Sequence, residues 1–258
     1  MRTRIHARLT YSAAAPCTVL MQLKADDGDG QRVLRDQLSL GPHSDLSEIP
    51  ADASVGRRIW LNVTEGLDAS YEAEVEVTRP RPDWNGLSTD PLPSLPPEAV
   101  TYLMSSRYCR ADALGDFLPA TFNGLCGGPL VRAMADWIKA SLTYDIFAST
   151  PETTALDTFA ARRGVCRDYA HLLITMARSS AIPARIVSVY GPDVDPPDFH
   201  AVAEVWLSGG WHMIDPTGMA TADRLVRIGV GRDAADVAFL TAFGFLELQE
   251  QSVSCRTG

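Results

Sequence analysis

The chain has 258 residues, of which 46% are hydrophobic and 21% charged, and its formal net charge is −9. This composition is typical of a soluble globular protein with one large domain or two ordinary ones. The negative charge would repel phosphate groups, so it argues against nucleic acid as a partner. No window holds about 18 consecutive apolar residues, so we expect no membrane-spanning helix.

The start of the chain and its cysteines both favour a cytoplasmic location. The first residues, MRTRIHARLTYSAAAP, alternate polar and apolar side chains, which is typical of a strand and not of a signal peptide. The five cysteines are scattered, odd in number and form no CxxC pair. We therefore expect reduced thiols, no metal site and no cofactor.

Residues 1–79 are predicted to form an all-β domain. The segments RIHARLTY, CTVLMQLKA, RRIWLNVTE and SYEAEVEVTR carry apolar or β-branched residues at alternate positions, with turn-forming residues between them. Their spacing favours a small antiparallel β-sandwich. Residues 80–97 contain six prolines, which predicts an extended connector and not a helix or a central strand.

Helical periodicity begins after the connector, and residues 98–258 are predicted to form an α+β domain. The segments PEAVTYLMSSRY, GGPLVRAMADWIKASLTYD and TTALDTFAARRG are predicted helices, and a fourth helix begins at Cys166. The segments PARIVSVYG, FHAVAEVWLSGGWHMIDPTG and DRLVRIGVG are predicted strands, with a hairpin turn at Gly209–Gly210. Beyond Arg232 the pattern fits a helix and then a strand.

Cys166, in the segment RRGVCRDYAHLL, is a candidate nucleophile because it stands at the start of a predicted helix. Unpaired N–H groups and the positive end of the helix dipole favour a thiolate there. A buried structural thiol is the alternative. A nucleophilic thiolate also needs a base, and the base must be oriented. His171 lies about 140° round the helix from Cys166, so it points elsewhere, while His6 and His43 belong to the β half.

His200 and His212 remain, and both lie on the predicted hairpin. Side chains alternate between faces along a strand, so Asp215 shares a face with His200 and His212 points away. A two-residue turn would place Asp215 opposite Glu204, about 13 Å along the strand from His200. We therefore expect a wider loop or a bulge in the hairpin. On this reasoning, a tight and unbulged turn would exclude the triad of Cys166, His200 and Asp215.

The motifs RRGVCRDYAHLL, IPARIVSVYG, FHAVAEVWL and GWHMIDPT resemble the core of the transglutaminase-like superfamily of papain-fold cysteine enzymes. The resemblance covers residues 135–218, and the all-β first part is similar in architecture to bacterial members, some of them named cysteine protease. It implies an antiparallel β-sandwich followed by a papain-like core of helices on an antiparallel sheet. It also implies that Cys166 is the nucleophile, His200 the base and then the acid, and Asp215 the group that holds the imidazole.

The family's chemistry is attack on an amide carbonyl through a thioester, after which water or an amine takes the acyl group. The resemblance thus implies a cysteine-dependent amide hydrolase with a peptide or protein substrate. Acyl transfer to an amine, as in transglutaminases, and a non-catalytic scaffold or binding module stay open as alternatives. The oxyanion would be met by the Cys166 N–H and a second donor, for which Tyr144 is a candidate. Asp168 and Tyr169 fit helix-start chemistry or support of the site equally well.

Overall fold

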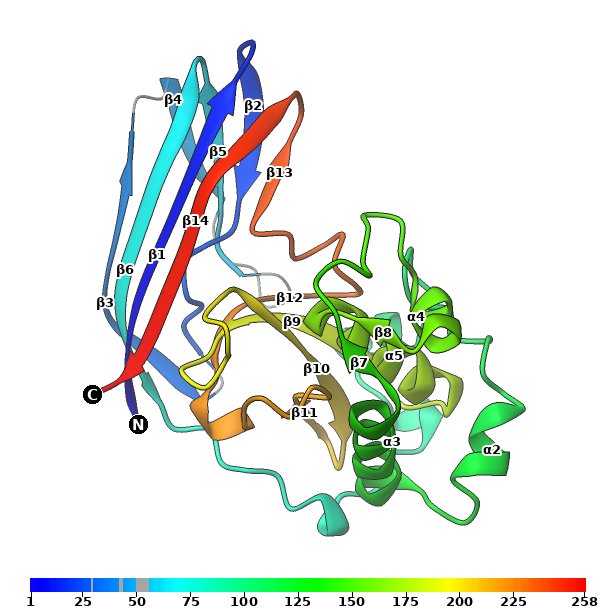
Figure 1. The fold of residues 1–258 in the computed structure, drawn as a ribbon. Coiled ribbons are helices and arrows are strands. Elements are labelled where there is room, and N and C mark those ends of the chain that lie inside the picture. Colours follow the sequence, from blue (N-terminus) through cyan, green and yellow to red (C-terminus); the bar gives the residue numbers. More distant parts are fainter. Residues whose placement is uncertain (29, 42–43, 50–55) are drawn as a thin grey trace.

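The computed structural model describes residues 1–28, 30–41, 44–49 and 56–258, so His43 lies outside the described residues. It consists of a long β-sandwich and a core of helices and sheet, which lie side by side (Figure 1). This is the α+β architecture that the sequence predicts. None of the helices in the described part is long and apolar enough to cross a membrane.

Two four-stranded sheets form the sandwich, with strand orders β14-β1-β6-β3 and β13-β2-β5-β4. Burial alternates along the strands, as in β6, because every second side chain points into the core between the sheets. Strands β1, β2, β5 and β6 match the segments predicted from the sequence. The sandwich strands are β1 (Arg2–Ala13), β2 (Cys17–Met21), β3 (Gln31–Leu40), β4 (Ser44–Ile49), β5 (Arg58–Val63), β6 (Gly66–Val77), β13 (Leu240–Ala242) and β14 (Leu246–Thr257).

The last two strands correct the predicted extent of the core, which does not run to residue 258. β14 is antiparallel to β1 from one end to the other, and β13 pairs with β2. The two ends of the chain therefore lie next to each other (Figure 1). The described residues after Arg232 contain no helix, in contrast to the prediction. Most side chains of β14 are polar and at least partly exposed, so its sequence carries little information about which sheet it joins.

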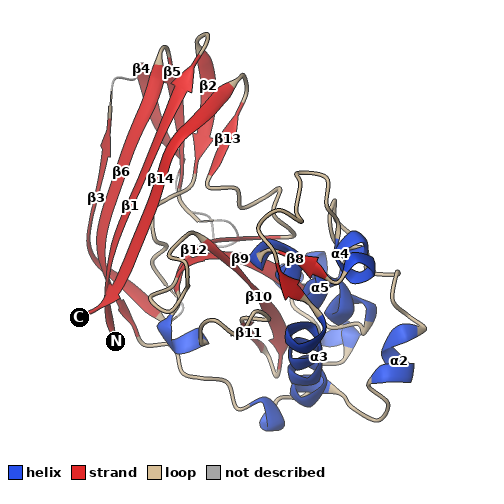
Figure 2. Cartoon of the chain, in the orientation of Figure 1, coloured by secondary structure: helices blue, strands red, loops and turns tan. Residues whose placement is uncertain are grey.

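The core is built on a four-stranded antiparallel sheet of order β11-β10-β9-β12. Helix α5 packs on β9 and β10 and is flanked by α3 and α4. Helices α2 to α5 lie on the side of the core away from the sandwich (Figure 2). The core elements are α1 (Pro97–Val100), α2 (Phe117–Thr121), α3 (Gly127–Ser141), β7 (Thr143–Tyr144), α4 (Ala155–Ala161), β8 (Arg163–Gly164), α5 (Cys166–Ser179), β9 (Ala184–Tyr190), β10 (His200–Leu207), β11 (Gly210–Ile214) and β12 (Val226–Gly231).

The first predicted helix of the core is shorter than expected. Only α1 is α-helical, and a 3-10 turn at Thr101–Leu103 follows it. The connector before it contains two further 3-10 turns, at Trp84–Gly86 and Leu92–Ser94, and it crosses the start of α3 closely. A side chain at Gly128 would collide with the Trp84 carbonyl, so glycine is required where the connector passes α3.

Direct contacts join the sandwich to the core at β12 and at the end of β9. The Tyr190 ring stacks on Tyr71 with centroids 6.2 Å apart, and its hydroxyl donates to the Leu23 carbonyl at 2.9 Å. The Gln31 side chain donates to the Arg227 carbonyl at 2.9 Å and accepts from the Arg227 N–H at 2.7 Å. Buried polar contacts of this kind fix the relative position of the two parts.

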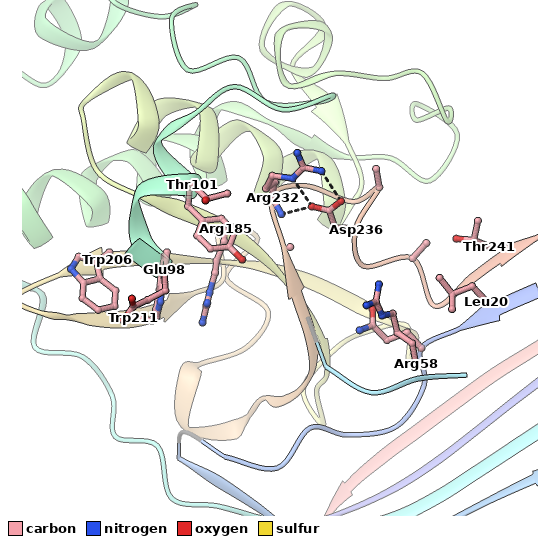
Figure 3. Close-up of a pocket in the computed structure, with 15 residues that line it drawn as sticks. Leu20, Arg58, Glu98, Thr101, Arg185, Trp206, Trp211, Arg232, Asp236 and Thr241 are labelled. Carbon is pink, nitrogen blue, oxygen red and sulfur yellow. Dashed lines mark hydrogen bonds and ion pairs between the residues drawn. The ribbon is translucent and has the colours of Figure 1, made fainter. Parts of the chain in front are cut away.

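A cavity of about 880 Å³ lies between the sandwich and the core (Figure 3). At one end the guanidinium of Arg185 lies 4.0 Å from the ring centroid of Trp211 and forms an ion pair with Glu204 at 2.7 Å. Residues of β2 and β13 line the other end. Neither Cys166 nor His200 lines this cavity, so it is separate from the predicted site.

The pairing of β14 with β1 predicts a clear difference between two positions on β14. Val253 is 7% exposed and Leu248 is 47% exposed. Val253→Ala should lower the free energy of unfolding by about 1–3 kcal/mol, because it removes buried methyl groups. Leu248→Ala should change it by less than about 0.5 kcal/mol. Urea unfolding followed by circular dichroism measures both, and equal effects would contradict the placement of β14.

Candidate active site

Cys166 is the first residue of α5, and the residues around it fix it there. The buried carboxylate of Asp168 accepts a hydrogen bond from the Val165 N–H at 2.9 Å, so it holds the residue that precedes the cysteine. A Cβ at Gly164 would lie 2.7 Å from the Cβ of Asp168, which leaves room for glycine only. Asp168 therefore acts in helix-start chemistry, and the partly exposed Cys166 sits at the positive end of the helix.

His200 and Asp215 are in direct contact. His200 Nε2 lies 3.0 Å from Asp215 Oδ2, and the two side chains are 1% and 0% exposed. Three more donors bind the same carboxylate: the Thr217 N–H at 2.9 Å, the Thr217 hydroxyl at 2.7 Å and the Ala220 N–H at 3.0 Å. The turn that follows β11 thus holds the carboxylate in place for the imidazole.

Cys166 is the third residue of the predicted triad, and it affects the pKa of the His200 imidazole. Burial would lower the pKa of His200, but the hydrogen bond with Asp215 and the interactions with Cys166 raise it to about 10. Nδ1, the other ring nitrogen, is buried and has no hydrogen-bond partner among the residues that the structure describes. Burial would also raise the pKa of Asp215, but the hydrogen bond and charge of His200 hold it below its usual range. The structure therefore joins His200 to Asp215 by a hydrogen bond, and Cys166 lies near enough to the imidazole to affect its pKa.

The hairpin reaches this arrangement in a way that corrects the predicted register. Leu207 pairs with Gly210, so the turn has two residues, Ser208 and Gly209, and the β10–β11 pairing shows no bulge. Both turn residues have positive φ, at 49° and 76°, as two-residue hairpin turns of type I′ require. The prediction of a wider loop or a bulge was therefore wrong. The prediction that a tight turn would exclude the triad was also wrong, because His200 and Asp215 are in contact across a tight turn.

Two details explain why the tight turn is compatible with the contact. The turn lies one residue earlier than predicted, so continuing the pairing would set Asp215 opposite Val202 and two residues from His200. Diagonal neighbours at this offset are about 7–8 Å apart, a gap that the imidazole and the carboxylate together can close. Asp215 also follows the last paired residue of β11, so the ladder does not fix its direction. The predicted parity was right, because this offset keeps His200 and Asp215 on one face.

The other two predicted residues lie next to Cys166. Burial, the charge of Cys166 and a hydrogen bond with its thiol raise the pKa of Tyr144 well above its usual value, although the Cys166 N–H acts in the opposite direction. The Tyr144 hydroxyl thus keeps its proton at neutral pH and can donate a hydrogen bond. The buried Tyr169 supports it, with ring centroids 5.9 Å apart.

The remaining core histidines are held elsewhere. His171 is fully buried, its Nε2 accepts from the Ala234 N–H at 3.1 Å, and burial lowers its pKa to about 3. His212 Nε2 lies 3.0 Å from the Leu207 carbonyl. Sequence reasoning did not identify Thr217 as a partner of Asp215. The segment DPTG could have indicated this partner, since Asp and Thr side chains commonly form hydrogen bonds within a turn.

The raised pKa of His200 predicts a pH dependence. The imidazolium stabilises the folded protein below the usual pKa of about 6.5, and this contribution is lost as the pH rises through about 10. In Asp215→Asn the pKa of His200 should fall to about 6.5 or below, because burial is then less well opposed. NMR titration of the imidazole measures both values. Asp193→Asn, which has no bond to His200, is the control, and an unchanged titration in Asp215→Asn would contradict the prediction.

The sequence matches two known protein families. Residues 129–216 match the transglutaminase-like superfamily, and residues 1–88 match the bacterial transglutaminase N-terminal domain. The crystal structure of a "Putative Cysteine Protease" from Cytophaga hutchinsonii is 32% identical in sequence, with a TM-score of 0.92 over 99% of this chain and 90% of that one.

Two matches to curated proteins cover shorter segments. The Mycobacterium leprae protein ML0607 is 36% identical over 118 residues, which are 42% of each chain. A protein-glutamine gamma-glutamyltransferase from Pseudomonas aeruginosa is 29% identical over 131 residues, which are 38% of this chain and 20% of that one. The chain thus spans less than half of either protein. On the motifs, the fold and the whole-chain similarity to the Cytophaga structure, this chain belongs to the transglutaminase-like superfamily.

Proposed function

We propose that the protein is a cysteine-dependent amide hydrolase that acts on a peptide or protein through a thioester on Cys166. The observation that carries the proposal is the buried bond of 3.0 Å between His200 and Asp215, on an imidazole whose pKa Cys166 also raises. A scaffold or binding module would need none of these three groups. Burying the charged pair also costs desolvation free energy, which a purely structural role gives no reason to accept.

In the proposed reaction the Cys166 thiolate adds to the amide carbonyl. The Cys166 N–H and the Tyr144 hydroxyl donate to the oxyanion that forms. When the C–N bond breaks, the His200 imidazolium gives its proton to the leaving amine, and a thioester remains. His200 then takes a proton from water, which attacks the thioester. The C–S bond breaks, the acid leaves, and the Cys166 thiolate and the His200 imidazolium are restored. Asp215 orients the ring and stabilises its charged form throughout.

Acyl transfer to an amine is the second candidate. It uses the same thioester and the same three residues, and only the final acceptor differs. The similarity to the Pseudomonas aeruginosa protein-glutamine gamma-glutamyltransferase favours it, over 38% of this chain. Incubation with glutamine peptides and a labelled primary amine separates the two reactions. Hydrolysis releases acid without incorporation of the label, whereas transfer attaches the amine.

The nucleophile is tested by labelling with limiting iodoacetamide at pH 6, followed by mass mapping. Cys126 is the exposed internal reference, and burial raises the pKa of Cys109 and of Cys255 to about 12, so these two should not react. We expect Cys166 to react at least about tenfold faster than Cys126, because an unactivated thiol is mostly protonated at this pH.

The same experiment has a matched pair of variants. His200→Ala should remove the preference for Cys166, because the thiolate loses its cationic partner. His212→Ala changes a histidine on the same hairpin that points away, so it should keep the preference. Equal labelling of Cys166 and Cys126 in the unaltered protein would refute the proposed nucleophile.

A further inference from the structure

Two large apolar side chains are exposed on a short turn directly after β7. Ile146 is 63% exposed and Phe147 is 89% exposed. The turn is well formed: the Asp145 carbonyl accepts from the Ala148 N–H at 3.2 Å, and Asp145 Oδ1 accepts from the Phe147 N–H at 2.9 Å. Neither apolar residue belongs to the hydrophobic clusters of the described chain. Packing of the hydrophobic clusters therefore does not explain why these two exposed residues are apolar. We refer to residues 145–148 as the apolar lip.

The lip is tied to the residues on either side of Cys166. Before the lip, the Asp145 N–H donates to the Gly164 carbonyl at 3.0 Å, which continues the β7–β8 pairing. After the lip, Arg167 Nη2 donates to the Ser149 hydroxyl at 2.5 Å and to the Thr150 carbonyl at 2.8 Å. Gly164 and Arg167 bracket the cysteine in sequence. The two ends of the segment are thus held by sequence neighbours of Cys166, Gly164 through its backbone and Arg167 through its side chain, and the tip between them is left exposed.

Tyr144 connects the lip to the reacting atoms. It directly precedes the lip, it pairs with Gly164 two residues before Cys166, and Cys166 affects the pKa of its hydroxyl. A substrate carbonyl bound at this hydroxyl would bring the neighbouring substrate residue toward the lip. An exposed phenyl ring and an isoleucine side chain would gain by burial against an apolar partner, whereas they would offer nothing to a charged one.

We infer that the apolar lip recognises a large apolar side chain in a polypeptide substrate, next to the residue whose carbonyl Cys166 attacks. This inference rests on the proposed function, since it names the substrate class of the same site. Burial of one such side chain against Ile146 and Phe147 should favour the apolar substrate over its alanine analogue by roughly tenfold.

The test uses probes that alkylate Cys166, so it does not require turnover. Two pairs of peptide probes carry Phe or Ala beside the position that stands for the attacked residue. On the acyl side they are chloromethyl ketones of glycine with Phe or Ala directly before the glycine, and on the leaving side they are iodoacetyl peptides with Phe or Ala directly after the iodoacetyl group. In each case the sulfur forms a bond to carbon and a halide ion leaves. The unaltered protein should react roughly tenfold faster with the Phe member of at least one pair. The double variant Ile146→Ser, Phe147→Ser should reduce this ratio to about one.

Two controls separate the possible failures. Iodoacetamide, which has no side chain to recognise, should label Cys166 equally in the unaltered protein and the double variant. Phe245→Ser removes a phenylalanine that is 71% exposed on the sandwich, and it should keep the Phe preference. Absence of a Phe preference, or its survival in the double variant, would overturn the lip while leaving the nucleophile intact. Failure of iodoacetamide to select Cys166 would instead overturn the proposed function, and the lip proposal with it.

Discussion

The site depends on one tight contact at the start of α5, where the Asp168 side chain packs on Gly164 and accepts from the Val165 N–H. This contact joins the end of β8 to the first turn of the helix, so it fixes the direction in which the backbone enters the helix. Cys166 is placed by that entry, and the Tyr144 hydroxyl is placed beside it because β7 pairs with β8. A larger residue at position 164 would displace all of these groups together, and not the cysteine alone.

The second half of the site is built in a different way, from polar groups with almost no access to water. A buried imidazole and a buried carboxylate are each unfavourable alone, and they are tolerated because each satisfies the other. The Thr217 and Ala220 donors fill the remaining positions on the carboxylate of Asp215. The helix therefore supplies an accessible sulfur, while the sheet supplies a buried base whose Nε2 is held by a fully bonded carboxylate. Neither element forms a reactive site without the other.

Sequence reasoning was strongest where a periodic rule applied and weakest where partners were set by distant contacts. Helical periodicity located α3, α4 and α5, and strand parity placed His200 and Asp215 on one face. The register failed because one residue of turn position decides it, and the segment WLSGGWH offers two neighbouring glycine-containing turns. Strands β3 and β14 are polar along most of their length, so their hydrogen-bonding partners and not their own patterns define them. The lip was missed because exposure cannot be read from apolar letters alone.

The pairing of β1 with β14 has a consequence for synthesis of the chain. β1 lies between β6 and β14, so one of its edges is covered only when residues near 257 have left the ribosome. Until then the nascent sandwich presents an open edge with unpaired N–H and C=O groups, which can recruit a foreign strand. At roughly 5–20 residues per second, the roughly 180 residues between β6 and the end of β14 correspond to a delay on the order of ten seconds or more. Chaperone protection would matter most during that interval.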